Sequence, residues 1–262
     1  MSRHLRQMTP EEVFDEDKAQ EYEHMRQALW HEELVRAHTS MCIIEHVARF
    51  PARLLLDPTR GTFLPLVFGN FVDHVVLVVT KVFEEGGRGV PLTLPRLRNW
   101  IQENCRPEVQ AEVRRALKGL RKKAEVKRLL EKARTLRHKR IAHRDVDWVR
   151  NPAAQTAVRV SLEDLRALLA EAEQWIRALS VGGDVAMVPL SYSDLVQYPT
   201  GLDLRSDIEY FLDLLAADSA LLKMPEEQPE QWTHHKRTLT EAGRTLFNEW
   251  RERVGWEPVE FD

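Results

Sequence analysis

The sequence predicts an all-α fold, a helical bundle followed by a small, acidic, mainly helical C-terminal appendage. Apolar residues along most of the chain recur three and four positions apart, which is the spacing of one buried helix face. The most apolar run, Phe63 to Val79, lies in a helical pattern from Phe63 to about Glu85 that is too long for a typical strand, and Asp73, His74 and Lys81 interrupt any strand-like alternation. At 262 residues the chain suits one domain with an appendage.

The first helices have clear boundary signals. Thr9-Pro10-Glu11-Glu12 is a helix start, with Thr at the N-cap, Pro in the first turn and Glu at the third position. Helical periodicity continues from there to about Phe50, with room for one break, and residues 51–61 end it with two prolines and a glycine. The helix from Phe63 to Glu85 follows, and the glycines of residues 86–89 end it.

The remaining elements of the bundle follow in order. We expect a short helix over residues 93–104 and one long basic helix from Pro107 to about Arg140. Residues 157–160 suit a short extended segment. Ser161-Leu162-Glu163-Asp164 then has the N-cap pattern and opens a helix to about Leu179.

Gly182-Gly183 marks the predicted domain boundary, between a helical domain of residues 10–181 and an appendage of residues 185–262. The appendage has seven Lys and Arg against fifteen Asp and Glu, a net charge of −8. That charge argues against nucleic-acid binding by the appendage and favours a partner-binding or dimer-supporting role. Helices are expected over about residues 204–222 and 240–254, with residues 225–229 as a loop between them.

Composition excludes several classes. The two cysteines, Cys42 and Cys105, form no CxxC pair, so neither a disulfide framework nor a cysteine zinc site is expected. The N-terminus has no apolar signal segment, and the apolar run after Phe63 contains ionisable groups that are costly in lipid. We therefore expect a cytoplasmic protein without a membrane partner. His24, His31, His38 and Glu45 recur every seven residues, about 10 Å apart, so we interpret them as a solvated or interface stripe without a metal.

A basic segment lies inside this acidic protein. Residues 114–144 contain fourteen Lys and Arg against two Glu, a net charge of +12, whereas the whole chain has −3 and the remainder therefore −15. Such a segment can attract phosphate groups. It can equally be the solvated face of a helix, and composition alone leaves both interpretations open.

The most informative residues end the basic segment, in the run Leu136-Arg137-His138-Lys139-Arg140-Ile141-Ala142-His143-Arg144-Asp145. Six positions on an α-helix leave Arg137 and His143 roughly 120° apart, so they converge only if the helix changes course or a partner helix meets it. Arg offers a planar set of donors to a phosphodiester, and His exchanges a proton near neutral pH. Such a pair can activate a ribose 2′-hydroxyl without a metal, leaving a 2′,3′-cyclic phosphate and sparing DNA.

This run resembles the signature of the HEPN superfamily, an Arg, a polar residue and then a His after four to six intervening positions. Its ending, Ile-Ala-His-Arg-Asp, is most similar to the abortive-infection AbiU-type branch. Residues 78–84 and 92–97 resemble the helix ending and the short-helix entry of the same branch. The resemblance spans about residues 27–179 and implies an α-helical bundle.

The resemblance also implies roles for particular residues. Arg137 and His143 correspond to the catalytic pair, and His138 to the polar residue that supports it. An acidic residue on an earlier helix completes the site in many members, and Asp73 and Glu84 are both candidates. Some toxin members carry Tyr two positions after the His, where this chain has Asp145, so regulation through that Tyr is in doubt. The basic side chains expected to contact RNA are Lys132, Arg134, Lys139, Arg140 and Arg144.

Two functions from different classes follow. The first is a metal-independent endoribonuclease without a cofactor, acting as a toxin, abortive-infection or antiviral defence effector. The resemblance implies RNA as its substrate, a homodimer with a composite site, and an antitoxin or other regulatory protein as a partner. The alternative is a non-catalytic module that binds RNA, a nucleotide or another protein. In that case His143 would be a solvated residue near a helix C-terminus, where positive charge is favourable.

Overall fold

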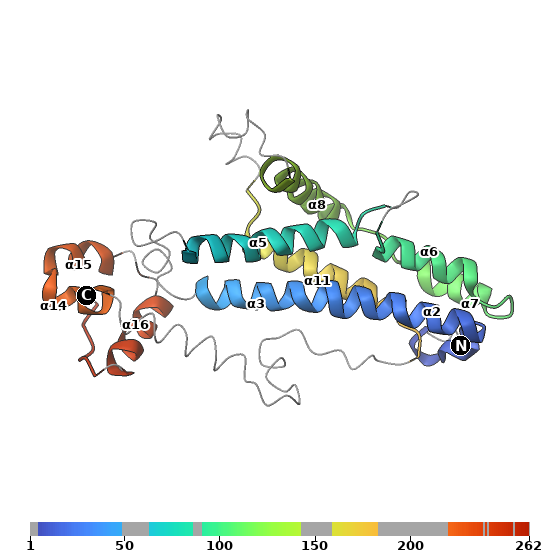
Figure 1. Ribbon diagram of the computed structural model, residues 1–262, viewed down its shortest axis with the longest axis horizontal. Coiled ribbons are helices and arrows are strands. Elements are labelled where there is room, and N and C mark those ends of the chain that lie inside the picture. Colours follow the sequence, from blue (N-terminus) through green and yellow to red (C-terminus); the bar gives the residue numbers. More distant parts are fainter. Residues whose placement is uncertain are drawn as a thin grey trace. The chain divides into compact units, whose positions relative to one another are not determined.

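The computed structural model describes residues 5–48, 63–85, 91–142, 159–182, 220–237, 239, 241–253 and 255–261. These residues contain helices and no strand, which confirms the predicted all-α class (Figure 1). The chain divides into two compact units. Unit 1 comprises residues 1–41 and 72–188, and unit 2 comprises residues 42–71 and 189–262. The predicted boundary between residues 181 and 185 stays a prediction.

The N-terminal third is helical, with one break. It contains η1 (Leu5–Gln7), α1 (Pro10–Val13), α2 (Glu16–Gln27), the π-helical segment η2 (Ala28–Val35) and α3 (Arg36–Ala48). Thr9 and Glu12 form the capping box that the sequence predicts. The break falls at Phe14 and Asp15, and α2, η2 and α3 then follow one another without interruption (Figure 1).

Helix α5 (Phe63–Val82) confirms the second predicted helix, ending three residues before Glu85. It runs antiparallel to α3 within unit 1. The Ser40 hydroxyl lies 2.9 Å from His74 Nδ1, and Lys81 Nζ lies 2.5 Å from Glu33 Oε1. These two contacts set the register of the pair, because they join positions seven residues apart on each helix.

The single long basic helix expected from Pro107 to Arg140 is wrong. After α6 (Leu94–Asn104), the chain forms α7 (Gln110–Leu117), a connection over residues 118–123, and α8 (Ala124–Leu136). Gly119 lies in the connection, and Lys122 turns inward to reach the carbonyl of Phe83 and the carboxylate of Glu85. A continuous helix would hold Lys122 on its own surface, so these contacts require the break.

Helix α11 (Leu162–Leu179) is the centre of unit 1 and contacts η1, η2, α6, α7 and α8. It begins with the predicted capping box between Ser161 and Asp164. The Trp175 ring meets the Phe83 ring edge-on, with centroids 5.8 Å apart, where α5 ends. Glu171 is also buried and accepts a hydrogen bond from the Trp175 indole, and the remaining buried side chains of this helix are aliphatic: Leu165, Leu168, Leu169, Ala172, Ile176 and Leu179.

The end of α11 is fixed by Tyr22 of α2. Its fully buried hydroxyl donates to the Leu179 carbonyl and accepts the Val181 N–H, at 3.0 and 2.8 Å. Gly182 follows with φ at +92°, and a Cβ there would lie 2.9 Å from Pro10 Cδ. Only glycine both adopts this positive φ readily and lacks the Cβ that would clash with Pro10.

In unit 2 the structure describes α14 (Ala220–Glu227), α15 (Pro229–Lys236) and α16 (Glu241–Arg253). The expected helix over 240–254 is confirmed by α16. The expected loop over residues 225–229 is wrong, because α14 continues through Pro225 and only Gln228 separates it from α15. Burial of Leu222 and Met224 and the contact of Arg251 with Glu226 hold α14 across the proline. Most of the helix expected over 204–222, and part of the segment expected over 157–160, lie outside the described residues.

Candidate functional site

The motif that contains Arg137 and His143 directly follows a well-packed amphipathic helix, α8. Helix α8 contacts α11, and its buried residues recur three and four positions apart: Val126, Leu129, Leu130, Ala133 and Leu136. The Lys and Arg at intervening positions lie on the more exposed side of the helix. The packing of α8 on α11 therefore fixes where the motif leaves the bundle.

The helix changes its winding where the motif begins. Arg137 opens a π-helical segment, η4 (Arg137–Ala142), and its N–H reaches the carbonyls of Ala133 and Arg134. Short π segments are rare and occur often at functional sites. A change in helix course was one of the conditions for Arg137 and His143 to converge. His143 and Arg144 lie outside the described residues, so their positions stay predictions.

Arg137 is held loosely and is accessible. Its side chain is 29% exposed, and Nη1 lies 3.8 Å from Glu84 Oε2, beyond hydrogen-bonding distance. An exposed ion pair of this length is weak, so a phosphate could replace Glu84 at little cost. His138 is exposed beside it.

Asp73 and Glu84 each lie beside a different arginine of η4. Asp73 Oδ1 lies 3.1 Å from Arg140 Nη2, whereas Glu84 lies beside Arg137. Burial raises the pKa of the Asp73 carboxyl, and the charge of Arg140 partly offsets this. The structure therefore brings Glu84 to Arg137 and Asp73 to Arg140, and a catalytic role for Asp73 stays a prediction.

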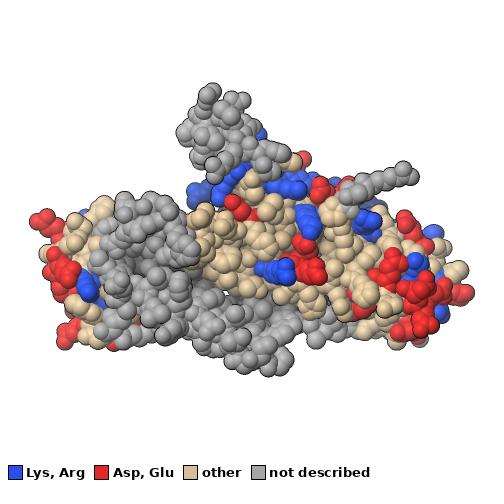
Figure 2. Space-filling model, viewed as in Figure 1, with Lys and Arg blue, Asp and Glu red and all other residues tan. Residues whose placement is uncertain are grey.

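Several cations expected to bind RNA are engaged within unit 1. Lys132 Nζ lies 3.7 Å from Asp164 at the start of α11, and Arg134 Nη2 donates to the Phe83 carbonyl at 3.4 Å. Arg140 pairs with Asp73, and Lys139 is half-buried. These side chains join α8 and η4 to the neighbouring helices, and their role toward RNA stays a prediction. On the face drawn in Figure 2, Lys and Arg gather near α5 and α8, while Asp and Glu gather where α2 begins.

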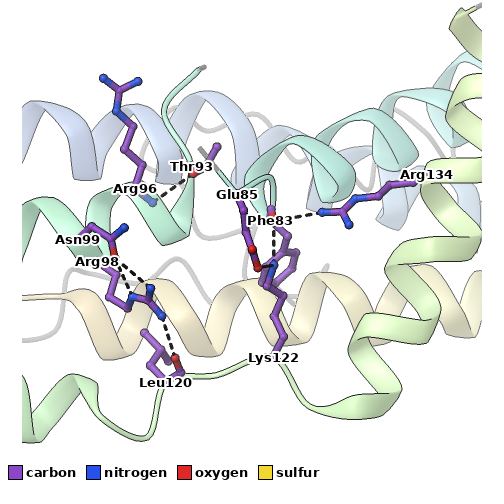
Figure 3. Close-up of polar contacts among 9 residues, drawn as sticks. All are labelled: Phe83, Glu85, Thr93, Arg96, Arg98, Asn99, Leu120, Lys122 and Arg134. Atoms are coloured by element: carbon purple, nitrogen blue, oxygen red, sulfur yellow. Dashed lines mark hydrogen bonds and ion pairs between the residues drawn. The ribbon is translucent and has the colours of Figure 1, made fainter. Parts of the chain in front are cut away.

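The C-terminal end of α5 is a second polar centre beside Arg137. Lys122, whose side chain is 9% exposed, donates to the Phe83 carbonyl at 3.2 Å and lies 2.6 Å from Glu85 Oε1. Arg134 reaches the same carbonyl from the other side (Figure 3). Two cations at a helix C-terminus complement its partial negative charge. Sequence reasoning missed Lys122 and Glu85, and the signal for them was Gly119, which ends α7 and lets the chain turn back toward α5.

Two histidines, His38 on α3 and His74 on α5, lie in partly or fully buried positions. The pKa of His38 falls to about 4 because the ring is buried. Burial also lowers the pKa of His74, whose Nδ1 contacts the Ser40 hydroxyl. The predicted solvated stripe is therefore wrong at His38, which is only 8% exposed. In the described ranges no three His, Cys, Asp or Glu side chains gather closely enough to hold a metal ion, and no helix is long and apolar enough to cross a membrane.

A helical bundle with a basic helix that ends in the Arg137 motif defines a HEPN-type domain. The model of the AbiU2 family of HEPN domains matches residues 19–194, well over half of the chain, so the chain belongs to this family. The match confirms the resemblance found from the motif and extends it at both ends. Neither a curated protein nor a solved structure matches the chain. The protein thus contains an abortive-infection HEPN domain.

Proposed function

We propose that this protein is a metal-independent endoribonuclease in which Arg137 and His143 act on an RNA phosphodiester. The observation that carries the proposal is the setting of Arg137. Its guanidinium is accessible, it opens a π-helical turn in a strongly basic segment, and its acidic neighbour Glu84 lies at 3.8 Å without a hydrogen bond. Membership of the AbiU2 family supports an effector role in abortive infection.

In the proposed reaction, the Arg137 guanidinium binds two non-bridging oxygens of the scissile phosphate and stabilises their developing charge. His143 accepts the proton of the ribose 2′-hydroxyl as the O2′–P bond forms. The P–O5′ bond breaks, and the protonated imidazole returns a proton to O5′. The products are a 2′,3′-cyclic phosphate end and a 5′-hydroxyl end, so atoms and charge balance without an added reactant.

A homodimer with a composite site is part of this proposal. Arg137 and His143 are six positions apart on one helical segment, which turns them roughly 120° away from each other in regular α-helical winding. A second protomer would bring the histidine of one chain to the arginine of the other. An antitoxin or other regulatory protein that holds the enzyme inactive is the corresponding partner.

The test is cleavage of a mixed RNA pool in EDTA by wild type, Arg137→Ala and His143→Ala. We expect wild type alone to cleave, with cyclic-phosphate ends, and each variant to lose at least a hundredfold in rate. Mixing the two inactive variants should restore part of the activity, because each mixed dimer keeps one complete site. Activity that stays absent in the mixture would contradict the composite site while leaving the ribonuclease proposal in place.

The same assay separates the enzyme from a binding module. If folded wild type binds RNA but leaves it intact, and His143→Ala binds equally well, the chain is an RNA-binding HEPN module. RNA cleavage that persists in both single variants would show that other residues carry the reaction and would reject the proposed pair.

A further inference from the structure

A basic groove that the motif does not include lies beside the C-terminal end of α5. A cavity of about 380 Å³ opens between the start of α6, the connection before α8, and α11. It is lined by Arg98, Arg121, Lys122 and Lys127, with Glu85 as its one acid and Trp175 and Pro95 as its apolar part. An adjoining cavity of about 320 Å³ shares Arg98 and Arg121 and adds Arg114 and Lys118.

The cations that line this groove differ in whether another side chain already pairs with them. Lys122 pairs with Glu85, so the one carboxylate among the described residues that line the larger cavity is already neutralised. Arg98 is held in place by the Asn99 side chain and the Leu120 carbonyl, 6.0 Å from the Trp175 ring centre (Figure 3). Arg121 and Lys127 are exposed and form no ion pair with any described residue. Concave surfaces lined by one sign of charge concentrate the field and draw in ligands of the opposite sign.

The start of α8 adds to this positive potential. Lys123 occupies its N-cap position without a side-chain cap, although the N-terminus of a helix already has a partial positive charge. Glu171, 3.7 Å from the Lys123 Nζ, and Glu125 in the first turn of α8 compensate part of this charge. A phosphate in the neighbouring groove would compensate more of it.

Two consecutive residues, Glu84 and Glu85, link the groove to Arg137 along the chain. Glu85 lines the larger cavity, and Glu84 lies beside Arg137. Neighbouring Cα atoms are about 3.8 Å apart, so the carboxylate that lines the groove and the one beside Arg137 come from adjacent positions of the chain. Two joined cavities lined by six cations suit several phosphates in a row, as a strand backbone presents them, better than a single one.

From this geometry we infer that the groove holds the backbone phosphates of the single-stranded RNA next to the cleaved bond, with Arg121 and Lys127 as its principal contacts. The inference rests on the proposed function and extends it, because it gives the strand a path across the surface. It also differs from the expectation drawn from sequence. Several of the cations nearest the motif are engaged with α5 and α11, and accessible charge without a described ion pair lies in the groove.

The test compares two double variants of the full chain that remove the same charge. Arg121→Ala/Lys127→Ala removes the two exposed cations that line the larger cavity. Arg115→Ala/Arg128→Ala removes two exposed cations of the same segment that line neither cavity. Both pairs are placed in a His143→Ala background, which prevents cleavage. Binding of a fluorescent twelve-nucleotide oligouridylate is measured in EDTA across a salt series, with thermal unfolding as a check of folding.

We expect the groove variant to bind RNA about tenfold more weakly or worse at 0.1 M salt. Its slope of log K against log salt should fall by about 1.4, because each phosphate contact to a single strand contributes about 0.7. The control pair should stay within about twofold, because neither side chain lines a cavity and exposed charges that do not contact the strand are weakened by salt screening. Equal losses in both pairs, or none in either, would overturn the inference.

Free nucleotide is the other source of phosphate, and AMP and inorganic phosphate are titrated in parallel. If the groove variant loses AMP or phosphate binding while RNA binding is unchanged, the groove is a small-anion site and the inference is wrong. The cleavage assay keeps the two proposals apart. Loss of RNA binding in the groove variant, together with a wild type that never cleaves, would reject the ribonuclease and keep the groove.

Discussion

At the residue scale, Asp73 on α5 and Glu84 just after it lie beside different arginines of η4, which differ in how tightly they are paired. Arg140 lies 3.1 Å from Asp73, whose carboxyl is partly buried, so this pair holds η4 against α5. Arg137 meets Glu84 at 3.8 Å, where both side chains are partly exposed. The Arg140–Asp73 pair is the closer contact, although the Arg140 side chain is 47% exposed and the Arg137 side chain 29%. The longer Arg137–Glu84 pair is the one that can exchange its acid for a substrate phosphate at little cost. Of the two arginines described in η4, Arg137 is therefore the less tightly paired.

His38 should make the protein less stable in acid. Its pKa is about 4 in the folded protein and about 6.5 when unfolded, so between these values the unfolded chain binds a proton that the folded chain does not. Stability is complete above pH 6.5 and falls as the pH drops. At about 1.36 kcal/mol per pH unit, the loss between pH 7.5 and 4.5 is roughly 2 to 3 kcal/mol. Urea unfolding of wild type and His38→Leu at both pH values measures it.

The variant should show a pH dependence smaller by this amount. His31, one heptad earlier on the same helical stretch, is exposed and supplies the control. His31→Leu should keep the wild-type pH dependence, because an exposed ring has a similar environment in both states. If His38→Leu and wild type lose stability equally between the two pH values, burial of a neutral His38 is not the cause of acid sensitivity.

At the scale of elements, local signals predicted the helices that begin with a cap. Thr9 and Ser161 carry side chains that bond the third residue of the helix, and both helices start where expected. The break at residues 118–123 was missed, because Lys and Arg favour helix and one glycine is tolerated inside it. The contact that selects the break, between Lys122 and the Phe83 carbonyl, joins residues 39 apart and leaves no local signal.

Lys122 should contribute to stability by closing the end of α5. Its side chain is 9% exposed, and the ammonium group donates to the Phe83 carbonyl and the Glu85 carboxylate. Lys122→Met keeps the apolar stem and removes the donor, so we expect the free energy of unfolding to fall by about 1.5 to 3 kcal/mol. Lys127→Met, at an exposed position nearby, should change it by less than about 0.5 kcal/mol. Chemical denaturation of both variants decides whether Lys122 is structural, and equal effects would contradict that role.

At the scale of the whole molecule, the accessible positive charge gathers through folding. The sequence alone predicted a segment of +12 in an acidic chain and located Arg137 and His138. It did not predict the groove, because Arg98 and Trp175 come from α6 and α11 and approach Arg121 and Lys127 only in the folded bundle. A motif is local in sequence, whereas a binding groove depends on how distant helices pack, so the first was predictable and the second was not.

The described C-terminal helices of unit 2, α14 to α16, surround a buried cation, Arg251. Arg251 is 1% exposed and donates to the carbonyls of Leu222 and Glu257 and to the carboxylate of Glu226. Its guanidinium also lies 5.9 Å from the ring centre of Phe247 and 5.5 Å from that of Trp256. The side chain thus joins α14, α16 and the chain after α16, which an aromatic cluster of Trp232, Phe247 and Phe261 also holds together.

Arg251→Met should therefore loosen unit 2 and leave the core of unit 1 protected. The substitution leaves two carbonyls without this donor, so we expect the local free energy of opening in α14 to α16 to fall by about 2 to 4 kcal/mol. Hydrogen exchange read by mass spectrometry should show this as faster exchange in residues 220–261. Exchange in α8 and α11 should be unchanged, because their protection depends on contacts within unit 1. Arg237→Met, at an exposed site in the same unit, serves as the control, and faster exchange in α11 would show that the two units open together.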